Sequence, residues 1–239
     1  MRLLKLTLTF LLLSSTCSAQ TSNASLAQKG KVIITPQAGI GLSLLLYNTV
    51  NDYYQTHGRA PRGDGSVTTG RWMAGLHIGY MLTRKIGLVS GLVYDNSSWK
   101  FEATTSRDYK RTAQHRIQVP LLLHVQKLVD HRGGYYLNGG VNVSFLQRIN
   151  DHIYGGISKS DPNEFSKIAG ALQLNPGIII SPKRQISATL GVDVQCQVTN
   201  NFSAPGLQGN LFSAAVVLGV RWISSGNTAT RKESRKDPS

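Results

Sequence analysis

The stretch from residue 185 to residue 198 alternates apolar and polar side chains without interruption. Successive side chains of a β-strand point to opposite faces, so this spacing predicts a strand with two different faces. One face carries Ile, Ala, Leu, Val and Cys, whereas the other carries Ser, Thr, Gly, Asp and Gln. The second face is notable because it lacks the Lys and Glu residues that usually meet water in a soluble sheet.

Seven further segments repeat this theme, and each is rich in Val, Ile, Leu and Gly. Leu122, Leu146 and Val217 interrupt the polar faces, so the alternation is imperfect. No helical periodicity of useful length appears, and we therefore predict a chain made of strands. The eight segments span residues 32–47, 71–82, 86–94, 114–125, 135–147, 167–180, 185–198 and 210–222.

The composition of the polar faces indicates which side of the sheet points inward. Gly, Ser, Thr, Asn and Gln fit a cramped interior, and the apolar face would then contact lipid. A closed barrel satisfies all backbone groups in a medium without water. We therefore predict an all-β fold, an antiparallel, up-and-down transmembrane β-barrel of about eight strands. The alternative is a soluble secreted β-sandwich or a lipocalin-like binding protein.

The connections between the segments alternate in length. Residues 83–85 and 181–184 form tight turns, whereas 47–71, 95–112 and 150–166 form long loops. This alternation is expected when short turns lie on the periplasmic side of a barrel and longer loops lie outside the cell.

Aromatic residues fall near the ends of the predicted strands. Amphipathic rings favour the level of the lipid head groups, so we predict two aromatic girdles. The outer girdle comprises Tyr47, Trp72, Tyr94, Phe145 and Phe212, and the periplasmic girdle comprises Tyr80, Tyr135 and Trp222.

The N-terminus has the three-part pattern of a secretory signal peptide: positive charges, an apolar run, and small residues before a cleavage point. The apolar run is shorter than the roughly 20 residues of a transmembrane helix. A lipoprotein signal that uses Cys17 is a weaker alternative. We predict a signal peptide at 1–19, a linker at 20–30, a barrel at 31–223 and a basic, disordered tail at 224–239.

Cleavage after residue 19 would leave Cys196 as the only cysteine, which argues against a disulfide within the chain and against a cysteine-based metal site. We predict no cofactor, no metal site and no catalytic residue. The formal net charge of +14 suggests an acidic partner. For a secreted protein, lipopolysaccharide phosphates and anionic outer-membrane lipids are better candidates than nucleic acid. The other interpretation is a set of solvated loops.

Several ionisable residues lie on the faces that we expect to line the barrel. A charge in the lumen needs a partner, because an unpaired buried charge has a large desolvation cost. We expect Asp193 to pair with Arg116 or His77 in a polar network. The predicted members are His77, Arg116, His124, Asp193 and Arg221.

Three prolines, Pro36, Pro120 and Pro176, lie inside predicted strands. Each removes one hydrogen bond from a ladder, and a closed barrel has no free edge to accommodate the loss. The sequence does not show how they fit.

The run RIQVPLLLHV at residues 116–125 resembles a strand of the porin-family outer-membrane β-barrel domain, of the PorT-like, Bacteroidetes type. GYML at 79–82 followed by IGLVSGLVY at 86–94 is similar to its second hairpin, and the likeness spans about residues 30–223. The resemblance implies an outer-membrane barrel inserted by the barrel-assembly machinery. The segment GVRWI at 219–223 is a partial terminal insertion signal.

We interpret the chain as a non-enzymatic integral outer-membrane protein with a structural, surface-binding or secretion-accessory role, together with an unidentified envelope protein partner. A narrow pore for small solutes or ions is the alternative. Lipid A hydrolases of this size need a His, a Ser and a carboxylate in one arrangement. His115 lies near the outer end of its strand, but no His-x-Ser pair accompanies it.

Overall fold

The computed structural model describes most of the predicted barrel. The predicted signal peptide, nearly all of the linker and nearly all of the basic tail lie outside the described residues. Within the described part, no helix is long and apolar enough to cross a membrane. The described ranges are 30–49, 65–102, 109–129, 133–153, 156–158, 165–180, 185–203 and 207–224.

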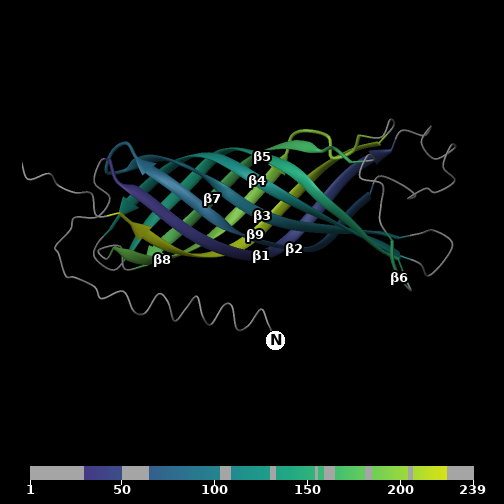
Figure 1. The fold of residues 1–239 in the computed structure, drawn as a ribbon, viewed down its shortest axis with the longest axis horizontal. Helices are drawn as coiled ribbons and strands as arrows, with labels where there is room; N and C mark the ends of the chain where they lie inside the picture. Colours follow the sequence, from purple (N-terminus) through teal and green to yellow (C-terminus); the bar gives the residue numbers. More distant parts are fainter. Residues whose placement is uncertain are drawn as a thin grey trace, which may run out of the picture.

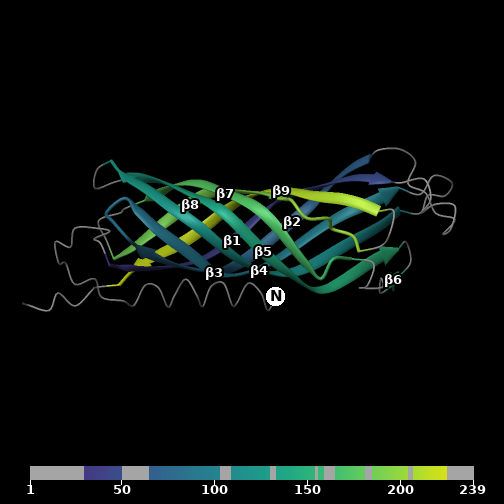
Figure 2. The same ribbon diagram turned by 90° about the horizontal axis from the view of Figure 1, so that it is seen from above.

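The described residues form nine strands, and eight of them close into a barrel (Figures 1 and 2). Each of the eight pairs antiparallel with the next one in the ring, and the pairing of β4 with β5 closes it. β6 is a short strand that pairs only with the end of β5. The strands are β1 (Val32–Thr49), β2 (Gly65–Met81), β3 (Ile86–Glu102), β4 (Tyr109–Leu128), β5 (Gly133–Ile153), β6 (Gly156–Ser158), β7 (Ile168–Ile180), β8 (Ile186–Gln197) and β9 (Leu207–Ile223).

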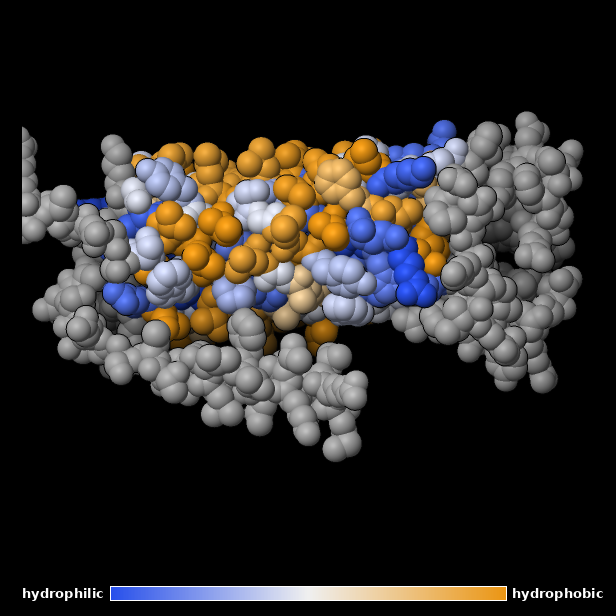
Figure 3. Space-filling model, in the orientation of Figure 1, coloured by the Kyte–Doolittle hydropathy of each residue, from blue (hydrophilic) through white to orange (hydrophobic). Residues whose placement is uncertain are grey.

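Side chains alternate between the outside and the lumen along most of each strand of the ring, as predicted, and a bulge of β5 opposite His115 and Arg116 is one exception. Val192 and Val216 are 42% and 53% exposed, whereas Thr189 and Gln195 are buried in the lumen. Figure 3 shows hydrophobic side chains over most of the middle of the visible face, with hydrophilic ones nearer its ends. A soluble sandwich would place these valines in its centre, so the structure excludes that alternative. The antiparallel eight-stranded barrel is confirmed.

The two ends of the barrel differ in their connections. At one end, which we call the turn end, residues 82–85, 129–132 and 181–185 join successive strands. At the other end, which we call the loop end, the connections are mostly longer. The bounds predicted for the loop at 95–112 are wrong, because both neighbouring strands extend into this range. β3 continues to Glu102 and β4 begins at Tyr109, because polar residues there still pair in the ladder. The apolar pattern marks only the middle of these strands and so underestimates their length.

The three prolines are accommodated in the barrel by the same pattern of strand pairing. Pro36, Pro120 and Pro176 each keep their partner in the ladder on one side. On the other side the ladder skips the proline and the residue before it, and then resumes in the same register. Each proline therefore interrupts the pairing with one neighbouring strand and leaves the register of that pairing unchanged.

The lumen contains apolar clusters as well as the predicted small polar residues. Leu45, Ile149, Phe165, Phe202 and Leu211 pack together at the loop end. A second cluster at the turn end contains Ile33, Met81 and Ile223, and a third on β2, β3 and β9 contains Met73, Val93, Ala215 and Val217. The expectation of a lumen filled mainly by Gly, Ser, Thr, Asn and Gln is therefore incomplete.

A tyrosine from β5 crosses part of the lumen towards two glycines. A Cβ atom added at Gly177 on β7 would lie 2.5 Å from the ring of Tyr136. A Cβ atom at Gly191 on β8 would overlap the Tyr136 hydroxyl oxygen. Both glycines are needed for this close approach, because any larger residue would overlap the tyrosine.

Candidate functional site in the barrel lumen

A buried ion cluster lies inside the barrel and joins three strands. Arg71 on β2 contacts Asp95 on β3 through its Nε atom at 2.5 Å. Its Nη1 atom contacts Asp193 on β8 at 3.0 Å. All three side chains are almost completely shielded from solvent. One guanidinium group thus holds two carboxylates that come from neighbouring and distant strands.

The prediction that Asp193 pairs with Arg116 or His77 is wrong about the partner, which is Arg71. Arg71 shares the inward face of β2 with His77, so the alternation of side chains places it in the lumen. The sequence did not point to Arg71 as a lumen residue because it is the first residue of the predicted segment 71–82. Asp95 was missed because the apolar pattern stops at the preceding residue.

The ion cluster extends into a chain of amide side chains. Gln173 Nε2 and Gln195 Nε2 donate to the two oxygens of Asp193 at 2.5 Å and 2.9 Å. Gln195 also donates to Gln118 Oε1 at 3.1 Å, and Asn142 donates to the same oxygen at 2.9 Å. The chain runs through β7, β8, β4 and β5, so it connects separate parts of the wall through the lumen.

Arg116 lies closer to the loop end and has only neutral partners among the described residues. Its Nε atom donates to Gln114 Oε1 at 3.1 Å. Its Nη2 atom donates to the Ser166 carbonyl oxygen at 3.0 Å and to Asn201 Oδ1 at 3.2 Å. These bonds attach the segments that flank β7 and β8 to the inner wall of β4.

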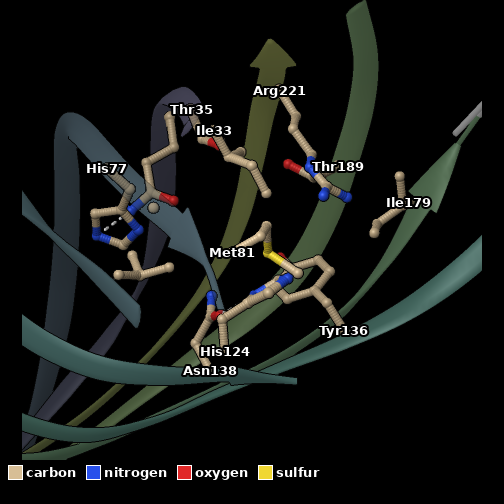
Figure 4. Close-up of a pocket in the computed structure, with 13 residues that line it drawn as sticks. Ile33, Thr35, His77, Met81, His124, Tyr136, Asn138, Ile179, Thr189 and Arg221 are labelled. Atoms are coloured by element: carbon tan, nitrogen blue, oxygen red, sulfur yellow. Dashed lines mark hydrogen bonds between the residues drawn. The ribbon is translucent and has the colours of Figure 1, made fainter. Parts of the chain in front are cut away.

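The other three predicted lumen residues surround a small cavity near the turn end (Figure 4). His124 Nδ1 lies 2.6 Å from Asn138 Oδ1, and Gln37 Nε2 lies 3.2 Å from His77 Nε2. Arg221 Nη2 donates to Gln126 Oε1 at 2.7 Å, which joins β9 to β4 on the opposite side of the ring. All five predicted residues are buried, but the structure places them in separate groups.

The predicted girdle residues face outward wherever their side chains are described. The side chain of Tyr47 lies outside the described part. Trp72, Phe145 and Phe212 lie slightly to the loop-end side of the middle of their strands, and Tyr94 lies at the middle of β3. Tyr80, Tyr135 and Trp222 lie near the turn end. Their contact with lipid head groups stays a prediction.

An outward-facing polar group surrounds His115 on β4. Tyr94 Oη lies 2.6 Å from its Nδ1 atom, and Asn150 Nδ2 lies 3.0 Å from its Nε2 atom. Asn96 Nδ2 also contacts Nδ1 at 3.0 Å, and the Trp72 ring lies beside Tyr94 at a centroid distance of 5.3 Å. His115, Asn96, Asn150 and Trp72 border an open pocket of about 330 Å³, which lies where the β2–β3 ladder ends at Arg71. The described neighbours of His115 thus include no serine and carboxylate pair.

Three solved structures of other proteins align with most of this chain at low sequence identity. No curated protein matches the chain. OprG from Pseudomonas aeruginosa aligns over 84% of this chain and 99% of its own, with 13% identity and a TM-score of 0.46. Neisserial surface protein A (NspA) aligns over 81% and 97%, with 12% identity and a TM-score of 0.42. The protease OmpT from Escherichia coli aligns over 86% and 100%, with 10% identity and a TM-score of 0.42.

A sequence profile of the family described as "Outer membrane protein beta-barrel domain" matches residues 19–203. The match includes every strand of the barrel except β9, which completes the ring in the structure. The closed ring, the outward apolar surface and this match agree, and the chain belongs to the outer membrane protein β-barrel domain family.

Proposed function

We propose that this outer-membrane barrel is sealed and non-enzymatic, and that it acts as a structural and surface-binding protein instead of a pore. The observation that carries this proposal is the set of bonds that cross the lumen. Arg71 joins β2 to β8, Gln195 joins β8 to β4, and Arg221 joins β9 to β4. Barrels of about eight strands are generally filled by their own side chains.

The apolar clusters at the two ends support the same conclusion. Side chains from several strands meet at the loop end, and Ile33, Met81 and Ile223 meet at the turn end. An ion that crossed the lumen would have to leave water beside these side chains, which is energetically costly. The described part of the lumen thus has an apolar cluster towards each end, and between them the hydrogen-bonded network lies beside a third apolar cluster.

Conductance in planar lipid bilayers tests the proposal. We expect the refolded full chain to insert without producing discrete current steps. Steps whose ion selectivity changes in the R71S variant would overturn the sealed barrel and support the narrow pore. Deletion of the gene, scored separately for envelope integrity and for protein secretion, separates a structural role from a secretion-accessory role.

The surface-binding role is assigned to the polar group around His115. Amide, imidazole and phenol groups there face outward beside an exposed tryptophan, and the exposed Arg148 pairs with His115 across the β4–β5 ladder. At the head-group level these residues would hold the phosphate and sugar groups of lipopolysaccharide. This proposal gives His115 a binding role and no role in hydrolysis.

Retention of lipopolysaccharide by the purified barrel tests this assignment. We expect H115A and W72A to retain less lipopolysaccharide after detergent washing than the unchanged chain does. Y135A is the matched control, because Tyr135 is also an exposed aromatic residue but lies at the turn end. Equal retention by all variants would refute the site, and hydrolysis of lipid A that H115A abolishes would refute the non-enzymatic role.

Biogenesis follows from the same proposal. The signal peptide at 1–19 would be cleaved, and the barrel-assembly machinery would insert the strands with the loop end outward. Membership of the PorT-like group is part of this proposal. Mass spectrometry of the mature protein should find Gln20 at its N-terminus, and protease treatment of whole cells should cleave only the loop end.

A further inference from the structure

The turn end of the lumen contains a cavity of about 40 Å³. Ile33 and Met81 line its wall, and both pack against Ile223. Figure 4 shows the Arg221 side chain extending from β9 towards Tyr136 and His124, which lie on the facing side. The cavity is therefore bordered by apolar residues and by a cluster of polar groups.

Arg221 is a buried cation without a counter-charge in the described part of the chain. It is 3% exposed, and its Nη2 atom donates to the neutral amide oxygen of Gln126. Its Nε atom is buried and has no hydrogen-bond partner. Both buried carboxylates, Asp95 and Asp193, contact Arg71. An unpaired buried charge carries a desolvation cost, so an anion beside Arg221 would be favoured.

Three other polar groups around the cavity can also donate hydrogen bonds. Thr189 and Tyr136 present hydroxyl groups, and His77 has one ring nitrogen that Gln37 does not contact. Both ring nitrogens of His124 already face the amide oxygens of Asn138 and Gln126. Among the described residues no carboxylate lines the cavity. A ligand at this position would thus meet one permanent positive charge and several neutral donors, which suits an acceptor with negative charge.

We infer that the cavity binds one small monovalent anion of halide size, held by Arg221 with help from Thr189 and Tyr136. A water molecule needs about 10–15 Å³ of such space, so the cavity has room for a halide with one or two waters. A nucleotide or a lipid phosphate group with its substituents does not fit. This site goes beyond the proposed function, because a sealed barrel does not require an anion.

Thermal unfolding of the refolded full chain in micelles tests the site. Sodium chloride or bromide is compared with sodium gluconate at equal ionic strength and pH. A ligand that binds only the folded state raises Tm with its concentration, so we expect a saturable rise of several degrees in halide. Crystals grown in bromide should show an anomalous peak beside the Arg221 guanidinium.

Variants make the test specific. R221Q should abolish the halide-dependent rise in Tm, whereas R84Q, which removes an exposed arginine that belongs to neither proposed site, should retain it. If R221Q does not fold, T189V tests the same site, and it should weaken the apparent halide affinity by about tenfold through the loss of one hydrogen bond to the anion. Only water in the cavity of bromide-grown crystals, or an equal halide effect in all variants, would overturn the inference.

Discussion

Arg71 and Arg221 are both buried inside the same barrel, but they balance their charges differently. Arg71 contacts two carboxylates at the centre of a hydrogen-bonded network. Arg221 contacts one neutral amide oxygen and borders a cavity. The comparison teaches that burial alone does not define a structural ion cluster. A paired cation fastens strands together, whereas an unpaired cation beside a cavity provides a place for a ligand.

The largest expected effect comes from removing the centre of the paired cluster. R71M leaves Asp95 and Asp193 buried without their shared cation, and it should lower the free energy of unfolding by about 3–5 kcal/mol. Urea-induced unfolding in lipid vesicles measures this loss. The matched control is R148M, at an exposed position, which should stay within about 0.5 kcal/mol of the unchanged chain. A loss below about 1 kcal/mol in R71M would contradict the central role of the cluster.

Neutralising one carboxylate should have a smaller effect. D193N keeps the shape of the side chain and leaves Arg71 paired with Asp95. It weakens charge-assisted hydrogen bonds from Arg71, Gln173 and Gln195, so we expect a loss of about 1.5–3 kcal/mol in the same unfolding assay. An effect as large as that of R71M would show that the two carboxylates act as one unit.

Tyr136, which lines the cavity beside Arg221, allows a test of side-chain packing in that part of the lumen. G177A places a methyl group against the Tyr136 ring and should destabilise the barrel by about 1–3 kcal/mol. G139A is the control, because its new methyl group would contact Leu174 at an ordinary 3.4 Å. Combining G177A with Y136L should recover part of the loss, since the two residues are in contact. Simple additivity would show that the glycine is not required by the tyrosine.

The smallest effect is expected at Arg221 itself in buffer without halide. R221M removes a hydrogen bond but also removes the cost of burying an unpaired charge, so stability should change by less than about 1 kcal/mol in either direction. Urea unfolding in sodium gluconate measures this change. A loss comparable to that of R71M would indicate a counter-charge from the part of the chain that the structure does not describe, and the contrast between the two arginines would fail.

The fold was largely predictable because it depends on local alternation. The segment at 185–198 became β8 (Ile186–Gln197), and its two faces point as predicted. Strand ends were less predictable. Polar residues such as Asn96 and Ser97 pair in the β2–β3 ladder although the apolar pattern has already ended. Hydrogen bonds of the backbone extend a strand regardless of side-chain polarity.

The sequence predicted several of the ionisable side chains that lie in the lumen, but not which of them contact each other. Asp193 was expected to be inside and to need a cation, yet its partner, Arg71, is 122 positions away in the chain. The apolar clusters show the same difficulty, because Phe165 and Phe202 lie outside the eight segments, and an isolated backbone bridge between them brings their rings together at a centroid distance of 5.5 Å. Such contacts depend on the register and on the closure of the ring.

By itself, the sequence determined that this chain forms strands with one lipid-compatible face and one crowded polar face, because alternate side chains of a strand point in opposite directions. The tertiary structure alone decided which buried charges meet and which stay apart. Ring closure brings β2 near β8 across the lumen, and no local pattern encodes that distance. The paired Arg71 and the unpaired Arg221 are therefore indistinguishable in the sequence and distinct in the folded barrel.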